Sequence, residues 1–389
     1  MDLLSFDIGR DSGFDGGRSA FGIAARSAGR AAAGASFVLL FALVLALASS
    51  FVLAIPAFGI EPKAGATVDL SSIRVRSWLA DYSFGSFSRT APTANFDRPK
   101  GVTLRWSKVK GARTYKVRLS RSKTLKGGRA WSTSKTSVSA NNLRVASTYS
   151  WKVVAYAGSK RLKSQSGWFR TKDAPRTLKV GGVQNLRDIG GHKTVFGKRV
   201  RQGMVLRSGR LNELTSTGAR QLRSGFGVRT ELDLRSSATV KLKRAPLGSA
   251  CTYKNVSGVY YDWNLSTASG RQQLVKELKV FVRADRYPVL VHCTAGTDRT
   301  GTLMFLLESL LGYDLATMMK DYELSFFSPV CSFGDFTVSQ RLGGIRGLHR
   351  LLSTYGDEGM TYQQRVERFV LDNGMTRAQV AAIRDVLLA

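Results

Sequence analysis

The chain has 389 residues, of which 43% are hydrophobic, so it can form two or three domains with ordinary cores. Its 59 lysines and arginines outnumber 27 aspartates and glutamates, and the net charge of +32 predicts attraction to polyanions. The three histidines and three cysteines show no metal-ligand spacing, so we expect chemistry without a metal or cofactor.

The N-terminal region combines arginines with a long apolar stretch. Residues 31–60 contain no charged side chain, and about 20 apolar residues are enough to cross a bilayer. The arginines in residues 1–30 predict a cytoplasmic N-terminus. We therefore expect a single-pass anchor in the cell membrane, with the rest of the chain outside the cytoplasm. The alternative is a cleaved signal peptide and secretion, because small residues follow the apolar stretch.

Residues 66–175 predict a separate β domain. Apolar and basic residues alternate in 111–120 and 148–156, as in strands with one buried face. The pattern resembles a fibronectin type III β-sandwich with Trp106 and Tyr115 in its core. Such a module would serve as a spacer or docking surface, followed by a short proline-containing linker near residue 175.

The most informative segment is residues 292–301, which read HCTAGTDRTG. An apolar run at 287–291 predicts a buried strand before it, and residues 302–311 predict a buried helix after it. Backbone N–H groups between a strand and a helix N-terminus can surround a phosphoryl group. The residues of this predicted phosphate-binding loop are Thr294, Ala295, Gly296, Thr297, Asp298 and Arg299.

The loop carries the groups needed for nucleophilic catalysis. The positive end of the helix dipole favours a thiolate at Cys293, which would attack phosphorus. Arg299 offers a planar fork that can hold two phosphoryl oxygens. The Thr300 hydroxyl could donate to the sulfur when it becomes the leaving group. The alternative is that Cys293 is a structural thiol in a turn.

The loop resembles the active-site loop of cysteine-dependent protein tyrosine phosphatases, in the bacterial branch with an aspartate before the arginine. Residues 185–191, 206–211 and 231–236 also match that branch, in the same order, and the resemblance covers residues 178–389. It implies an α/β phosphatase fold with a central, mostly parallel sheet flanked by helices. It also implies that His292 helps to set the hydrogen bonds around the thiolate.

Two aspartates are candidates for the general acid that protonates the leaving group. Asp298 lies inside the loop, and the resemblance favours it. Asp262 follows a predicted strand, near the position where other tyrosine phosphatases carry an acid on a mobile loop. Asp188 and Arg235, with Arg187, are expected either to support the site or to form a structural ion-pair set beneath it.

The sequence predicts a protein-tyrosine phosphatase whose substrate is a phosphotyrosine protein or a small phosphomonoester. Phosphoinositides are an alternative, although Thr297 stands where members acting on them often carry lysine. A second alternative is a binding module for anionic cell-surface polymers with a vestigial active site. Nucleic acid is the least favoured partner, since no binding motif accompanies the charge. Pairing of Cys251 with Cys331 is left open.

Overall fold

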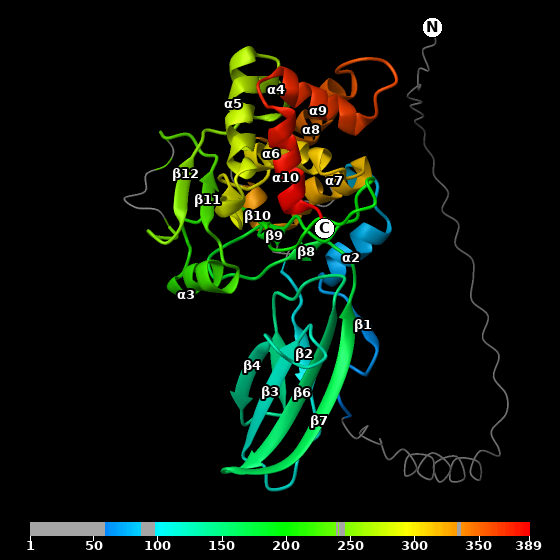
Figure 1. Ribbon diagram of the computed structural model, residues 1–389, viewed down its shortest axis with the longest axis vertical. Coiled ribbons are helices and arrows are strands. Elements are labelled where there is room, and N and C mark those ends of the chain that lie inside the picture. The colour runs from blue at the N-terminus through cyan, green and yellow to red at the C-terminus, as the bar shows by residue number, and fades with distance from the viewer. Residues whose placement is uncertain (1–58, 87–97, 239, 241–245, 333–335) are drawn as a thin grey trace, which may run out of the picture. The chain divides into compact units, whose positions relative to one another are not determined.

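The computed structural model describes residues 59–86, 98–238, 240, 246–332 and 336–389 (Figure 1). The predicted cytoplasmic segment 1–30 and nearly all of the predicted anchor or signal peptide at 31–60 lie outside these residues. Within the described ranges, no helix is both long and apolar enough to cross a membrane.

The N-terminal part of the described chain forms a mixed five-stranded sheet and a separate antiparallel pair of strands. Its strands are β1 (Ala66–Val68), β2 (Val102–Arg105), β3 (Thr114–Ser120), β4 (Arg129–Thr133), β5 (Ser137–Ala140), β6 (Thr148–Ala157) and β7 (Lys160–Thr171). Five of them form a sheet in the order β1-β7-β6-β3-β4, while β2 pairs with β5 alone. Only the β1–β7 pair is parallel.

The predicted alternation of apolar and basic residues is confirmed in these strands. Along β6, Tyr149, Trp151, Val153 and Ala155 are buried while the residues between them are partly exposed. Side chains from the five-stranded sheet and from the β2–β5 pair share one core, which includes Trp106. We call residues 59–72 and 98–171 the β domain.

The C-terminal part contains a six-stranded sheet in the order β12-β11-β13-β10-β9-β8. Its strands are β8 (Arg176–Thr177), β9 (Arg187–Asp188), β10 (Val205–Ser208), β11 (Thr230–Asp233), β12 (Thr252–Asn255) and β13 (Val289–His292). The strands from β12 to β10 pair in parallel, and β9 and β8 add antiparallel pairs at one edge. The predicted mostly parallel central sheet is therefore present.

Helices surround this sheet. The α-helices are α2 (Ile73–Ala80), α3 (Ser216–Arg220), α4 (Tyr261–Leu265), α5 (Ala268–Leu278), α6 (Asp298–Leu310), α7 (Leu315–Glu323), α8 (Val338–Ser353), α9 (Tyr362–Asp372) and α10 (Arg377–Leu387). Shorter helical turns are η2 (Gln221–Gly225), η3 (Lys279–Val282), η4 (Ala284–Arg286), η5 (Leu324–Phe327) and η6 (Pro329–Ser332). Capping boxes at Thr361 and Thr376 start α9 and α10, as their sequences predict.

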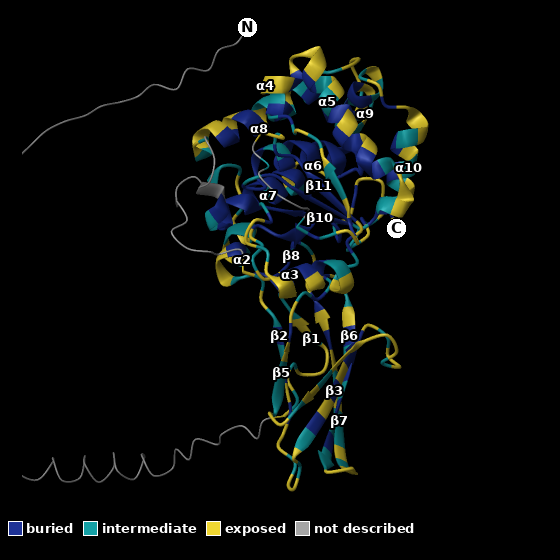
Figure 2. Ribbon diagram, turned by 90° about the vertical axis from the view of Figure 1, so that its left-hand side faces the viewer, coloured by how far each residue is buried: buried dark blue, intermediate teal, exposed yellow. Residues whose placement is uncertain are grey.

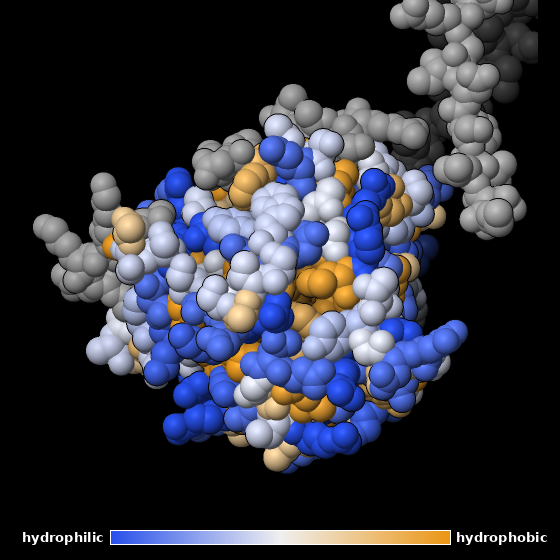
Figure 3. Space-filling view, turned by 90° about the horizontal axis from the view of Figure 1, so that it is seen from above, coloured by the Kyte–Doolittle hydropathy of each residue, from blue (hydrophilic) through white to orange (hydrophobic). Residues whose placement is uncertain are grey.

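The two faces of the sheet pack into different cores. Val289 and Val291 of β13 face a large core shared with α5 to α10, whereas Leu290 faces a smaller core that includes Leu222 of η2. Burial on both faces explains why β13 is apolar without alternation. In Figure 2 the central strands and α6 are dark blue, with exposed residues on the outer helices. Seen from above, hydrophilic side chains alternate with separate apolar patches (Figure 3).

The segment between β1 and β2 belongs partly to the C-terminal domain. Val75 of α2 joins the large core, and the Tyr82 hydroxyl donates to Glu323 at 2.8 Å. The β domain also contacts this domain directly, since the Gln202 side chain accepts from the amide of Val145 and donates to its carbonyl oxygen, each at 3.0 Å.

Candidate active site

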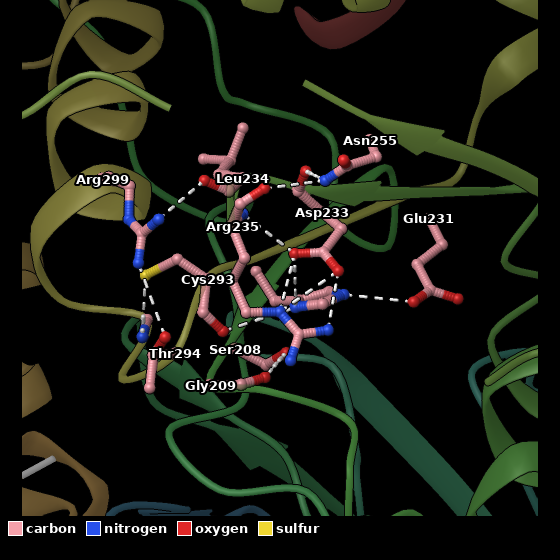
Figure 4. A network of polar contacts seen from close by, with 12 residues as sticks. Ser208, Gly209, Glu231, Asp233, Leu234, Arg235, Asn255, Cys293, Thr294 and Arg299 are labelled. Carbon is pink, nitrogen blue, oxygen red and sulfur yellow. Dashed lines mark hydrogen bonds and ion pairs between the residues drawn. The ribbon is translucent and has the colours of Figure 1, made fainter. Parts of the chain in front are cut away.

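Cys293 lies directly after β13, and α6 begins at Asp298, so the loop between them lies at the carboxyl end of the central parallel strands. The Cys293 side chain is buried, with 2% of the residue exposed. The backbone N–H of Gly296 donates to its Sγ at 3.2 Å. Figure 4 shows Cys293 and Thr294 with Arg299 extending over the same loop.

The loop needs glycine at two positions. Gly296 has φ +73°, and an added Cβ would lie 2.3 Å from the carbonyl oxygen of Ser208. At Gly301, in the first turn of α6, an added Cβ would lie 2.8 Å from the Tyr322 ring. Side chains at these positions would push the loop away from β10 and from α7.

Three donors hold the carbonyl oxygens of the loop from outside. Arg207 donates to Gly296 O at 2.9 Å, the Asn185 amide donates to Ala295 O at 2.9 Å, and the backbone N–H of Arg210 donates to Thr294 O at 3.0 Å. In a planar trans peptide the next N–H points the opposite way from the carbonyl. The following N–H groups are therefore directed to the inside of the loop.

Arg187 of β9 and Arg207 of β10 share the buried carboxylate of Asp321. Arg187 Nε donates to Asp321 Oδ1 at 2.8 Å, and Arg207 is ion-paired with Asp321 Oδ2. Burial alone would raise the pKa of Asp321, but the charges of Arg187 and Arg207 hold the pKa well below its usual value. This cluster links α7 to the outside of the loop.

A second buried network lies around His292. Its Nε2 is 3.1 Å from Glu231 Oε1, and its Nδ1 is 3.7 Å from Asp233 Oδ1. Asp233 also accepts from Arg235 Nη2 at 2.7 Å. Burial opposes ionisation of Asp233, but the bonds from Arg235 and the nearby His292 lower its pKa. The network fixes the imidazole that precedes Cys293. Figure 4 shows Glu231, Asp233 and Arg235 of this network.

Arg299 projects from the first turn of α6 and is held at its tip. Its Nη1 donates to Leu234 O at 3.2 Å, its Nη2 donates weakly to Thr294 Oγ1 at 3.5 Å, and its guanidinium lies 5.0 Å from the Tyr260 ring centroid. Its Nε is buried without a hydrogen-bond partner among the described residues. Donor capacity therefore remains for a bound anion.

The predicted threonines are also buried. Within the part of the chain that is described, Thr297 Oγ1 and Thr300 Oγ1 have no hydrogen-bond partner. The predicted bond from Thr300 to the cysteine sulfur is thus not among the contacts of this structure. The Thr300 hydroxyl is therefore still able to donate to another group.

The two candidate acids lie in different settings. Asp298 Oδ1 accepts from the Tyr261 hydroxyl at 2.6 Å and from Arg341 Nε at 3.0 Å. Asp262 lies in the short helix α4 rather than at the end of a strand, and it packs against Gly347 of α8, where an added Cβ would lie 2.3 Å from its Oδ2. The strand expected before Asp262 ends earlier, at Asn255, and the chain enters α4 at Tyr261, whose φ is +49°.

The remaining predicted residues have structural partners. Asp188 accepts from Arg176 at 2.5 Å and from the amides of Gly190 and Gly203, so it ties the linker to the sheet edge. Arg235 pairs with Asp233 as described above. Cys251 is a free thiol that donates to Val228 O at 3.0 Å. Among the described residues, no group of three or more histidine, cysteine or acidic side chains could hold a metal ion.

The sequence alone assigns no role to several residues that lie in the site. They are Asn185, Arg207, Tyr260, Asp321 and Arg341. The available signal is a charged residue inside an apolar strand or helix, as at Arg207 in β10, because a charge buried there needs a fixed partner. The identity of that partner requires the tertiary structure.

Comparison with known proteins agrees with this geometry. The profile described as the tyrosine phosphatase family matches residues 178–389. OCA1 of Eremothecium gossypii, named as a tyrosine-protein phosphatase, is 39% identical over 49 residues, which are 13% of this chain and 22% of that protein. OCA1 of Debaryomyces hansenii is 30% identical over 91 residues, which are 23% of this chain and 43% of that protein. The chain thus spans less than half the length of these curated relatives.

Two solved structures show some similarity to this chain. The core catalytic domain of the PP-IP phosphatase SIW14 from S. cerevisiae, in complex with citrate, has a TM-score of 0.30 and 16% identity, over 50% of this chain and 96% of that one. A cysteine-to-serine variant of P. aeruginosa TpbA in complex with phosphotyrosine has a TM-score of 0.26 and 18% identity. This match covers 39% of this chain and 87% of that one. Because these scores are low, the assignment rests on the family match. The chain belongs to the tyrosine phosphatase family.

Proposed function

We propose that the protein hydrolyses phosphomonoesters through a covalent phosphocysteine at Cys293, and that its preferred substrate is phosphotyrosine. The observation that carries this proposal is the bond from the Gly296 amide to the Cys293 sulfur, inside a loop whose peptide N–H groups face inward. Such a loop stabilises a thiolate and the charge that develops on the phosphoryl oxygens.

The proposed reaction has two steps. In the first step the Cys293 sulfur forms a bond to phosphorus, the ester P–O bond breaks, and the leaving oxygen takes a proton from a general acid. In the second step a water oxygen attacks phosphorus, the S–P bond breaks, and the water proton returns to that acid. Arg299 holds two phosphoryl oxygens in both steps, and the products are inorganic phosphate and an alcohol or phenol.

We assign the acid to Asp298 in preference to Asp262. Tyr261 and Arg341 both bind Oδ1 of Asp298, and Oδ2 makes no hydrogen bond among the described residues. The carboxyl group is therefore fixed through one oxygen and has the other for the leaving group. Asp262 packs against the backbone of α8, which leaves less freedom for a mobile acid.

An aromatic cluster beside Arg299 supports an aryl substrate. The rings of Tyr260 and Trp263 lie 5.4 and 5.0 Å from the ring of Phe336, and Trp263 is 43% exposed. Flat apolar rings next to the phosphate site suit a phenyl ring better than a polyhydroxylated one. Thr297 is buried and adds no cation, which disfavours the phosphoinositide alternative.

We also retain the proposals about location and partners. The uncharged sequence of residues 31–60 supports a membrane anchor, or else a signal peptide, that places the enzyme outside the cytoplasm. The β domain would then hold the catalytic domain, residues 178–389, away from the membrane in the manner of a fibronectin type III spacer. The charge of +32 supports contact with anionic cell-surface polymers.

Hydrolysis of an aryl phosphate by the full chain tests this function. Cys293→Ser should abolish turnover and keep the binding of phosphate analogues, whereas Cys251→Ser, at another buried free thiol, should leave turnover unchanged. Turnover that survives in Cys293→Ser contradicts the mechanism. No turnover in the unmodified chain, with polymer binding intact, supports the alternative of a vestigial site. A higher kcat/KM on inositol lipids than on phosphotyrosine peptides contradicts the substrate assignment.

A further inference from the structure

A basic pocket lies where the β domain meets the catalytic domain. It has a volume of about 230 Å³, and four of its lining residues are Arg121, Arg129, Arg144 and Arg176. None of its lining residues belongs to the catalytic loop, and none of those described is acidic. The pocket is therefore a separate positively charged cavity.

Backbone carbonyl groups hold two of these arginines in place. Arg129 donates to the carbonyl oxygens of Asn141 and Asn142, the latter at 3.3 Å. Arg176 donates from Nε to Leu143 O at 3.0 Å and from Nη2 to Asn142 O at 3.3 Å. Carbonyl oxygens fix the guanidinium groups but carry no full negative charge, so the charge of Arg129 is not neutralised.

Within the described residues, the only ion pair of these four arginines joins Arg176 to Asp188, and this carboxylate already has several hydrogen-bond donors. Asp188 pairs with Arg176 at 2.5 Å and accepts from the amide of Gly203 at 2.6 Å. Within the described residues, Arg121 and Arg144 form no ion pair with any aspartate or glutamate. Three of the four guanidinium charges are thus left without a counter-charge.

The arginines are close enough to repel one another. Burial lowers the pKa of Arg144, and the charges of Arg121 and Arg176 lower it further. Burial also lowers the pKa of Arg129, with an added contribution from Arg176. Repulsion of this kind costs stability, and a bound anion would relieve it.

We propose that this pocket binds a small soluble anion with two or more phosphoryl groups, which links the β domain to the catalytic domain. Each guanidinium fork can hold two phosphoryl oxygens, so several forks are matched by several phosphoryl groups rather than by one. Arg121, Arg129 and Arg144 come from the β domain, while Phe226 lies beyond α3 in the catalytic domain. A ligand that contacts both sides stabilises their association.

Calorimetric titration of the full chain with inorganic triphosphate tests this proposal. The titration uses an Arg299→Met background, in which the catalytic loop has lost its phosphate fork. We expect one molecule of triphosphate to bind this variant. Arg121→Gln and Arg144→Gln should each weaken binding by about tenfold or more, because each removes a charged fork from the pocket. Arg118→Gln, an exposed position on β3 outside the pocket, should leave it unchanged.

Two further results bear on the same proposal. Aryl phosphate hydrolysis by Arg121→Gln and Arg144→Gln, with Arg299 intact, should equal that of the unmodified chain, which shows that both variants fold. The absence of triphosphate binding in the Arg299→Met variant overturns the proposal. An equal loss of affinity in Arg118→Gln also overturns it, because the attraction would then be a diffuse effect of surface charge. Equal affinity for phosphate and triphosphate would overturn the requirement for more than one phosphoryl group.

Discussion

The backbone N–H of Gly296 donates to the sulfur of Cys293 at 3.2 Å, and this contact depends on the left-handed conformation of Gly296. The position is enclosed, because the carbonyl oxygen of Ser208 lies where a Cβ would be. Gly296 thus contacts both the Cys293 sulfur and strand β10, and it can do so only because it has no side chain.

Gly296→Ala should therefore reduce kcat/KM for an aryl phosphate by about 100-fold or more, since the loop must move away from the position in which it binds phosphoryl oxygens. Steady-state kinetics measures the effect. Gly343→Ala is the matched control, because this helical glycine has open space around it and no positive φ. Activity of Gly296→Ala close to that of the control would show that the loop conformation is unimportant.

Asp321→Asn should destabilise the fold by about 3–5 kcal/mol, because it leaves the buried Arg187 and Arg207 without their shared carboxylate. Urea denaturation at neutral pH measures the free energy of unfolding. The control is Asp285→Asn, which breaks an exposed ion pair with Arg283 and should change little. A similar small effect for Asp321→Asn would contradict the structural role of the cluster.

Acid should weaken the same cluster. The pKa of Asp321 is lowered in the folded state, so its ionisation stabilises the protein above the unfolded value of about 3.9. This contribution is lost as the pH falls from about 5 toward the lowered folded pKa. The free energy of unfolding of the unmodified chain should decrease over that range, and that of Asp321→Asn should decrease less steeply. Identical slopes would mean that the pKa of Asp321 is not lowered.

Tyr260→Leu should raise KM for phosphotyrosine peptides several-fold, with a smaller change in kcat, because the ring lies beside the Arg299 guanidinium, where the substrate's phenyl group would pack against it. Tyr156→Leu removes a comparable contact between an aromatic ring and Lys116 in the β domain and should leave both constants unchanged. If Tyr260→Leu affects aryl and alkyl phosphates to the same extent, the ring does not recognise the substrate's phenyl group.

Replacement of the two candidate acids should separate their roles. Asp298→Asn should slow an alkyl phosphate far more than an activated aryl phosphate, because only the poor leaving group needs a proton. Asp262→Asn should have a mild effect on both substrates. The opposite pattern would transfer the acid role to Asp262, and equal effects on both esters would show that Asp298 serves only the conformation of the loop.

Much of the catalytic domain follows from local sequence. The apolar run before His292 predicts β13, the residues after the loop predict α6, and threonines at 361 and 376 predict helix starts. Contacts between distant segments do not follow. The bond from Arg207 to the loop joins residues 89 positions apart, and only the sheet order brings them together. The setting of Asp262 could not be predicted from local sequence either. It lies in helix α4, which begins at Tyr261 with a left-handed backbone conformation, and not at the end of a strand.

The most direct test of the account is to trap the phosphoenzyme. The full chain is mixed with an aryl phosphate, quenched in acid within one turnover, and analysed by intact-mass and peptide mass spectrometry. We predict a protein carrying one phosphoryl group, located on Cys293, which disappears as the substrate is consumed and never forms in Cys293→Ser. Turnover by the unmodified chain without any phosphoryl group on Cys293, or with the group on another residue, would contradict the account.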